Sequence, residues 1–258
     1  MKYIFIFDED PLLPGKVDEN FVKFADLLGK DNFCVIKNNG KLINHPTEPF
    51  VAIYYGWMHT YESYKSMGED INKMGGKLLV SIDEYIANHH ISGWYSLIQD
   101  LTFPTQIIPN DSLEAFLDNF QPDFPVFVKD FVKSAGIYAK KITSSKELQD
   151  QIAIIKDRRG FIEVGIQLRK WVDLSNFNES RFFSVRGNII SDSTVPPIVK
   201  ESASRLSSRN FISIDYTTNG NEEYIVEIGD GQVSDPKNNS MEVMCKIFHV
   251  LINSNMDR

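Results

Sequence analysis

The chain has 258 residues, a formal net charge of −8 and a pI of about 5.2. Apolar residues make up 42% of it, which is ordinary for a globular protein with a substantial core. The acidic balance disfavours general binding to nucleic acid or anionic membranes, although a local basic groove can still bind phosphates. No apolar stretch reaches the roughly 18–20 residues of a membrane span.

The two cysteines and the N-terminal segment indicate the compartment. Cys34 and Cys245 are far apart and match no metal-binding spacing, which favours a reducing environment. The apolar run at residues 2–7 is too short for a signal peptide, and acidic residues follow it at once. The sequence therefore predicts a soluble cytoplasmic protein.

The first hundred residues alternate between strand and helix patterns. The apolar run at 2–7 is typical of a buried parallel strand, and it ends in three acidic residues. Such alternation favours an open α/β domain. The expected strands are 2–7, 33–37, 50–55 and 77–82; the expected helices are 17–28, 61–74 and one from 83 that can run to 100.

Prolines at 104, 109, 122 and 125 mark two breaks in the middle of the chain. A helix is expected between them at 111–120, with Asp111 as a plausible cap. Beyond the breaks, strand and helix signals again alternate. The expected elements are strands 126–131 and 137–142, helix 146–156, a strand-like run 161–172, hairpin 181–191, helix 198–205 and helix 241–253.

A strong hairpin signal occupies residues 211–228. Two β-like runs are joined by the turn Asn219-Gly220-Asn221, and each run carries one acid, Asp215 and Glu227. Carboxylate oxygens are the ligands that magnesium prefers, so the two acids form a candidate metal pair. An ordinary polar face of an edge hairpin is the alternative explanation.

The metal pair depends on the register of this hairpin. A three-residue loop puts Ser213 opposite Glu227 and Ile225 opposite Asp215. The two acids are then diagonal neighbours on one face, roughly 7–8 Å apart at the backbone. A two-residue loop would put them on opposite faces.

Two lysines near residue 130 are candidate phosphate ligands. Lys129 lies within an apolar strand, where an unpaired ammonium is costly and an anionic partner is favoured. Lys133 opens a turn of small residues, 133–136, whose backbone N–H groups can face phosphates. This is no Walker loop, since the required glycine spacing is absent. A solvated hairpin explains the two lysines equally well.

The acidic hairpin resembles the metal-binding end of the ATP-grasp fold, in which an apolar strand ends in Glu-x-Asn. Here the strand ends in Glu-Ile-Gly-Asp-Gly-Gln-Val from Glu227, so Gly229 replaces the expected asparagine. One metal ligand is then missing or is supplied by Asp230. The lysines resemble those of the family's small lid, with Lys129 and Lys133 covering the phosphates of ATP.

Other segments match the family in the same order along the chain. Residues 166–174, IQLRKWVDL, resemble the strand that leads to the adenine-binding hinge, although a lysine stands where glutamate is usual. The segment from Glu179 resembles a Glu-x-Arg-x-Phe motif, in which Arg181 stabilises a transferred phosphoryl group and Glu179 approaches the nucleotide. The resemblance implies nucleotide contacts by Arg169, Lys170, Trp171 and Val172.

The motif order over residues 105–250 most resembles a phage and bacterial ATP-grasp clade marked by a conserved arginine and two lysines. It implies a mixed α/β (α+β) ATP-grasp fold preceded by an open α/β domain. The expected division is an N-terminal domain at 1–105, a lid subdomain at 106–160 and a C-terminal subdomain with the metal hairpin at 161–258.

The resemblance implies an ATP- and Mg-dependent carboxylate–amine ligase that acts through an acylphosphate on small-molecule or peptide substrates. The acceptor site is expected between the N-terminal domain and the metal hairpin, near Asp8, Tyr55 and His59. A non-catalytic nucleotide-binding protein of the same fold is the main alternative, because Lys170 and Gly229 depart from the family pattern. A ligase that modifies nucleic acid ranks third, given the acidic charge.

Overall fold

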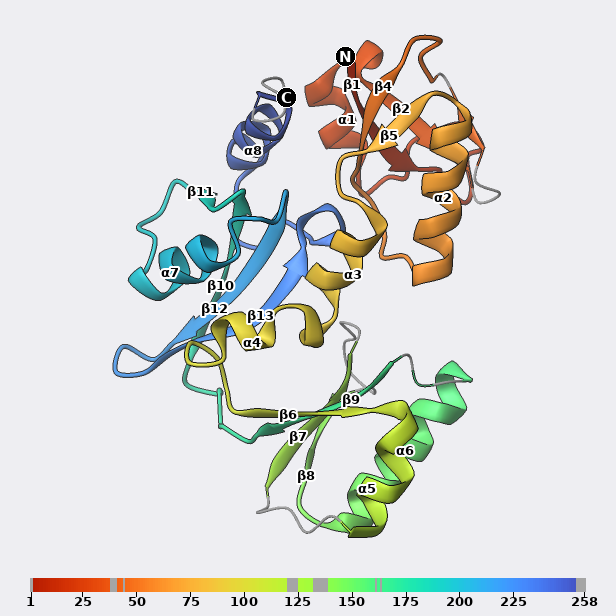
Figure 1. Ribbon diagram of the computed structural model, residues 1–258. Coiled ribbons are helices and arrows are strands. Elements are labelled where there is room, and N and C mark those ends of the chain that lie inside the picture. Colours follow the sequence, from red (N-terminus) through yellow and green to blue (C-terminus); the bar gives the residue numbers. More distant parts are fainter. Residues whose placement is uncertain are drawn as a thin grey trace.

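The computed structural model describes residues 2–37, 41–43, 45–119, 125–131, 139–160, 162 and 164–253. Its three sheets form three successive layers of the molecule, with the N-terminal sheet at one end and a small lid at the other (Figure 1). None of the helices in these ranges is long and apolar enough to cross a membrane.

The N-terminal sheet is open and mostly parallel, as the alternating pattern predicts. Its central strand buries Phe5, Ile6 and Phe7 completely, which explains why the strand is apolar on both faces. Helices α1 (Val22–Leu28) and α2 (Tyr61–Lys73) accompany this sheet. In spatial order its strands are β3 (Leu42–Ile43), β2 (Phe33–Ile36), β1 (Lys2–Asp8), β4 (Phe50–Tyr54) and β5 (Gly76–Leu78).

The lid is an antiparallel sheet with two helices on one face, α5 (Leu113–Asn119) and α6 (Ser145–Arg159). Val126 and Val128 point toward the helices, so Phe127 and Lys129 point to the other side, where the C-terminal sheet lies. The lid strands, in spatial order, are β6 (Thr105–Pro109), β9 (Gly165–Lys170), β7 (Val126–Asp130) and β8 (Ala139–Ile142).

The lid sheet extends beyond residue 160, where the sequence predicted that the lid subdomain ends. β9 pairs with both β6 and β7, so the run that the sequence assigns to the C-terminal subdomain lies in the lid. β6 falls where the prolines suggested only a boundary, because Pro104 and Pro109 flank a strand rather than replace it. Pairing between strands that are distant in the sequence decides which sheet β6 and β9 join, and no local sequence pattern predicts that pairing.

The C-terminal sheet carries a hydrophobic face and a polar face. The hydrophobic face is covered by α7 (Pro197–Arg205) together with α4 (Tyr95–Ile98), through buried residues such as Ile214 and Ile228. The polar face is turned toward the lid (Figure 1). Its strands, in spatial order, are β11 (Asn188–Ile190), β10 (Asn178–Val185), β12 (Ile212–Thr218) and β13 (Glu223–Asp230).

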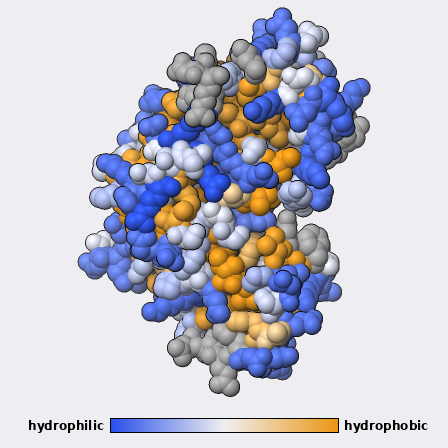
Figure 2. Space-filling view, viewed as in Figure 1, coloured by the Kyte–Doolittle hydropathy of each residue, from blue (hydrophilic) through white to orange (hydrophobic). Residues whose placement is uncertain are grey.

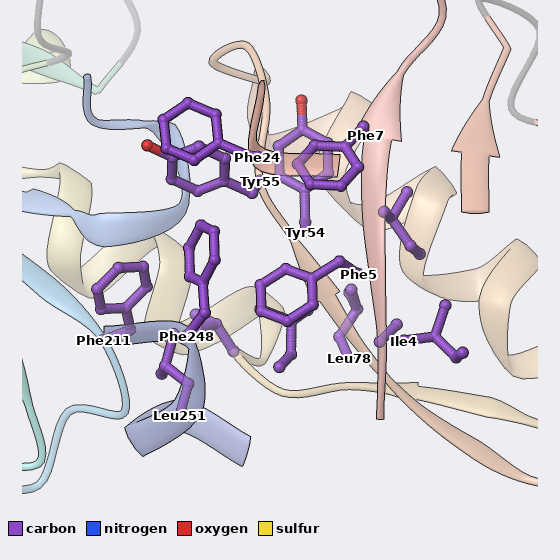
Figure 3. Packing of buried hydrophobic residues seen from close by; sticks show 14 of the residues in the cluster. Ile4, Phe5, Phe7, Phe24, Tyr54, Tyr55, Leu78, Phe211, Phe248 and Leu251 are labelled. Carbon is purple, nitrogen blue, oxygen red and sulfur yellow. The ribbon is translucent and has the colours of Figure 1, made fainter. Parts of the chain in front are cut away.

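Helix α8 (Met241–Asn253) returns from the C-terminal sheet to pack on the N-terminal sheet. The ring of Phe248 lies between rings from two neighbouring strands, 4.6 Å from Phe5 in β1 and 5.1 Å from Tyr55 just after β4 (Figure 3). This apolar contact joins the first and last elements of the chain in one core.

Two expected helices differ from the observed ones. The helix expected at 17–28 begins only at Val22, because Val17 forms a β-bridge with Glu9. The stretch expected to run as one helix from 83 to 100 is interrupted. Helix α3 (Ile82–His89) ends where Gly93 packs directly against the backbone of Ala87, too close for any side chain.

The β12–β13 hairpin has a register that differs from the expected one. Thr218 pairs with Glu223, so four residues form the loop, and a β-bulge follows between Asp215 and Tyr216. The bulge makes Asp215 the direct partner of Glu227. The expectation of one shared face is therefore confirmed, whereas the diagonal arrangement is wrong.

Candidate functional site

A row of charged side chains crosses the polar face of the C-terminal sheet. Lys129 Nζ lies 2.6 Å from Glu227 Oε1, and Glu227 is the direct cross-strand neighbour of Asp215. Arg181 donates from Nε and Nη2 to the two carboxylate oxygens of Asp215, at 2.6 and 2.8 Å. Its Nη1 donates to Asp235 Oδ1 at 2.8 Å. We call these five residues the charged row.

Strand pairing explains why the charged row forms. Arg181 pairs with Asp215 across β10 and β12, and Asp215 pairs with Glu227 across β12 and β13. Direct cross-strand partners project from the same face of a sheet, so the three side chains meet. Arg181 flanks the resulting acid pair on one side and Lys129 flanks it on the other.

The centre of the charged row is buried. The side chains of Arg181 and Asp215 are 2% and 5% exposed. Burial opposes the charge of the guanidinium, but the hydrogen bonds and attraction from Asp215, with Asp235 beyond it, outweigh burial and raise the pKa of Arg181. A bidentate pair of this kind fixes both side chains, and breaking it would leave a buried charge.

A cavity of about 370 Å³ opens beside the Glu227 end of the charged row, between the lid and β13. Three aromatic side chains line it, those of Phe103, Phe127 and Trp171. Hydrophobic residues gather on the part of the lid nearest this junction (Figure 2). All four residues that the sequence assigns to the adenine site line this cavity: Arg169, Lys170, Trp171 and Val172. A mostly apolar slot of this size, lined by aromatic rings, suits a heteroaromatic ring.

Arg169 connects the lid to the C-terminal sheet at this cavity. Its Nη1 donates to the backbone oxygen of Val226 at 2.8 Å, and its guanidinium lies 5.3 Å from the ring centre of Phe103. Burial lowers the pKa of Arg169, although Glu227 nearby acts in the opposite direction. Arg169 thus serves as a wall of the slot and as a tie to the strand that carries Glu227.

Two residues that the sequence assigns to the site lie away from its centre. Asp230 sits on the other face of β13, where it is fully buried and accepts hydrogen bonds from Asn88 and Gln232. Glu179 does not line the aromatic cavity; its Oε1 lies 2.6 Å from Lys237 Nζ. Asp230 is thus not placed beside Asp215 and Glu227 as the resemblance implied, whereas the nucleotide contact of Glu179 stays a prediction.

Lys133 and the turn that it opens lie outside the described residues. Gly229 pairs with Ser213 and contributes no side chain at the position of the missing asparagine.

Three residues at the charged row or the aromatic cavity were not predicted from the sequence. Asp235 and Lys237 lie in the loop after β13; Lys237 Nζ is 3.5 Å from Asp215 Oδ2 and links it to Glu179. Phe103 lies before β6 and lines the aromatic cavity. No motif marks these positions. An acid and a lysine flanking a proline just beyond the metal hairpin were the only available signal.

A second cavity, of about 670 Å³, opens at the opposite end of the charged row. Arg181 and Asp235 line it from the C-terminal sheet, and Tyr55 and Trp57 line it from the N-terminal domain. This is the region in which the acceptor site was expected. Asp8 lies behind it and accepts a hydrogen bond from the backbone N–H of Trp57 at 2.7 Å.

Magnesium is the metal that the resemblance implies, and the acid pair offers the oxygen donors it needs. No group of three or more His, Cys, Asp or Glu among the described residues is placed to hold a metal. Magnesium commonly takes one or two carboxylates and completes its shell with water and substrate phosphates. Asp215 and Glu227 fit that pattern, although each also contacts a cation of the charged row.

Three solved structures are similar to this chain over nearly its whole length. D-cycloserine synthetase DcsG matches with a TM-score of 0.68 at 9% identity, over 97% of this chain and 99% of its own. D-alanine–D-alanine ligase from Bacillus anthracis, complexed with ATP, matches with a TM-score of 0.61 at 11% identity, over 100% and 99%. The ATP-grasp ligase PsnB, with a precursor variant, Mg and ADP, gives 0.54 at 9% identity, over 97% of both chains.

The three-sheet architecture and these full-length matches define the fold class. The chain has the ATP-grasp fold, with a mixed α/β architecture and an open α/β domain at its N-terminal end. No protein-family model matches the sequence, and no curated protein matches it either.

Proposed function

We propose that this protein is an ATP- and Mg-dependent ligase that joins a carboxylate to an amine. One observation carries the proposal: the charged row, with its acid pair, spans the distance between an aromatic slot and a second cavity. A nucleotide in the slot would direct its phosphates along the row toward a substrate in the second cavity. The solved neighbours named as ligases, with ATP or with Mg and ADP, support this assignment.

The proposed reaction has two steps, phosphorylation of the carboxylate and formation of the amide. The carboxylate attacks the γ-phosphorus of ATP, which forms an acylphosphate and releases ADP. An amine then attacks the acyl carbon, and the amide forms as phosphate and a proton leave. Magnesium, held by Asp215 and Glu227, would neutralise the phosphate oxygens during the transfer.

The residues of the charged row take separate parts in this proposal. Lys129 faces the phosphate tail and is released from Glu227 when the phosphates arrive. Arg181 stabilises charge on the transferred phosphoryl group, since its planar fork matches phosphate oxygens. These two residues agree with the arginine and one of the two lysines of the clade that the sequence resembles. Lys133 is proposed to contact the phosphates from the adjoining turn.

Hydroxylamine trapping tests the proposal directly. An acylphosphate reacts with hydroxylamine to give a hydroxamate, so the purified protein with Mg-ATP and a pool of carboxylates should release ADP and form hydroxamate in equal amounts. ADP release without hydroxamate would refute the acyl intermediate. ADP or AMP formation stimulated only by RNA or DNA would favour a nucleic-acid ligase instead.

A second candidate is a nucleotide-binding protein without ligase activity. The observation that favours it is the pairing of both Asp215 oxygens with Arg181, which a metal would have to displace or bridge. Such a protein would gain thermal stability with Mg-ATP, yet release no ADP with any carboxylate or amine.

A further inference from the structure

The second cavity has a composition that points to a class of substrate, an inference that rests on the proposed function. Its apolar lining includes Phe21, Tyr55, Trp57, Met58 and Met241. Its volume of about 670 Å³ lies well within the range of pockets that enclose ligands larger than alanine. The cavity therefore offers a large apolar surface next to the proposed site of phosphoryl transfer.

Trp57 is an aromatic side chain that the protein holds firmly but leaves 55% exposed. Its indole Nε1 donates to Asp18 Oδ2 at 3.1 Å, and its backbone N–H donates to Asp8 Oδ2 at 2.7 Å. Its backbone oxygen accepts a hydrogen bond from the Tyr54 hydroxyl at 2.6 Å. An exposed aromatic ring whose backbone and indole nitrogen are both held by hydrogen bonds is a preorganised platform, because little further entropy is lost when a ligand packs on it.

The residue before Trp57 shows how tightly this platform is built. Any side chain at Gly56 would collide with the Asp8 carboxylate and the Tyr54 ring. The edge of the indole also meets Phe21, with ring centres 5.5 Å apart. The loop that carries Gly56 and Trp57 therefore packs closely around Asp8. This packing leaves the indole of Trp57 exposed.

Asp235 supplies an accessible negative charge at the other wall of the cavity. Its side chain is 72% exposed, and one oxygen is bound to Arg181 at 2.8 Å. The Arg181 guanidinium has five N–H groups, and contacts within the described residues account for four of them. A cation and an anion thus lie side by side on the wall of the cavity, and these charges complement the carboxylate and ammonium of an α-amino acid.

We propose that the second cavity binds a free α-amino acid with a large aromatic side chain, whose carboxylate is the group activated by ATP. The carboxylate faces Arg181, the ammonium faces Asp235, and the aromatic ring packs on Trp57. Aromatic stacking and a charge-assisted hydrogen bond are each sufficient for about a tenfold preference.

Calorimetric titration with four probes tests this proposal, both with and without Mg-AMPPNP. The probes are L-phenylalanine, L-alanine, 3-phenylpropionate and phenethylamine. The last three each lack one of the recognised groups. We expect phenylalanine to bind at least about tenfold more tightly than each of the others. Equal binding of alanine or of phenylpropionate, or no binding of phenylalanine, would overturn the proposal.

Four variants assign the contacts. Asp235→Asn keeps a hydrogen-bond acceptor for Arg181 and should weaken phenylalanine about tenfold while leaving phenylpropionate unchanged. Trp57→Ala should abolish the preference over alanine, whereas Trp57→Phe should keep most of it. Leu12→Ala, at an 86% exposed position outside the cavity, is the matched control and should change nothing. Loss of preference in that control would count against the assignment.

The titrations with and without Mg-AMPPNP distinguish a failure of this substrate proposal from a failure of the ligase proposal on which it rests. If Mg-AMPPNP binds and phenylalanine shows no preference, the substrate class is wrong and the ligase proposal stands. If phenylalanine binds as expected and Mg-AMPPNP does not bind, the cavity is correctly assigned and the ligase proposal fails.

Discussion

Glu227 is the residue on which the proposed chemistry depends most directly. Glu227→Gln keeps the side-chain shape but removes the charge that would hold magnesium. Because a metal contributes several kcal/mol at the transition state, we expect turnover to fall by about 1000-fold. ADP release measured against magnesium concentration checks this expectation.

The matched control for Glu227→Gln is Glu222→Gln, in the exposed loop of the same hairpin. Circular dichroism should show both variants folded. Wild-type turnover in Glu227→Gln would remove Glu227 from the metal pair.

Lys129 should bind the phosphates of ATP when they displace its contact with Glu227. Lys129→Ala should weaken ATP binding by about 10- to 100-fold, the worth of one hydrogen bond to a charged group. Titration of AMPPNP in the presence of magnesium measures this change. Lys140→Ala, on the opposite face of the lid sheet, should retain wild-type affinity. Unchanged affinity in Lys129→Ala would place the phosphates elsewhere.

Asp230 gives the protein a pH-dependent stability. Burial raises the pKa of Asp230 to about 7, although hydrogen bonds from Asn88 and Gln232 act in the opposite direction. The folded protein therefore holds this proton more tightly than the unfolded chain does. The stabilisation is complete at acidic pH and is lost as the pH rises toward 7.

Asp230→Asn removes this titration. Between pH 5 and pH 8, we expect the unfolding free energy of the variant to gain about 2–3 kcal/mol relative to that of the wild type. Urea denaturation at both values measures the difference. A constant difference across this range would show that Asp230 titrates normally.

Among the elements, the β-bulge in the β12–β13 hairpin has the largest consequence for the site. With a four-residue loop and regular pairing, Asp215 would face Val226, and Glu227 would point to the opposite side of the sheet. The extra residue at the bulge turns Glu227 to the same side of the sheet as Asp215 and brings the two side by side. The acids and their turn are evident in the sequence, but the bulge depends on the fit of β13 between the lid and β12.

Helix α8 should stabilise the protein through Phe248. Phe248 is buried against Phe5, Phe24 and Tyr55, so Phe248→Ala should cost about 3–5 kcal/mol of unfolding free energy. Chemical denaturation measures this cost.

Lys246→Ala on the exposed side of the same helix is the control. It loses only surface ion pairs with Asp192 and Glu242 and should cost far less than Phe248→Ala. Similar costs for the two variants would mean that α8 does not anchor the N-terminal core.

At the scale of the whole molecule, the nucleotide should tie the lid to the C-terminal sheet. Mg-AMPPNP should slow amide hydrogen exchange in β7, β9 and β13, which surround the aromatic slot. Exchange in β1, at the centre of the N-terminal sheet, should remain unchanged. Mass spectrometry of the exchanged peptides measures both. Protection confined to the N-terminal domain would contradict the assigned slot.

The sequence by itself determined the class of fold and most of its elements. Strand and helix periodicity placed β1, α2 and α8 closely, because buried faces require a regular apolar pattern. Four residues of the aromatic slot, Arg169 to Val172, were also accessible from the sequence, since they are consecutive in one strand and its continuation.

The tertiary structure decided what no local pattern encodes. Pairing of β9 with β6 and β7 set the extent of the lid, and a bulge aligned Asp215 with Glu227. It also turned Asp230 into the interior and brought Asp235 to Arg181. These outcomes depend on contacts between residues distant in the chain, and register, burial and charge pairing are fixed only when those residues meet.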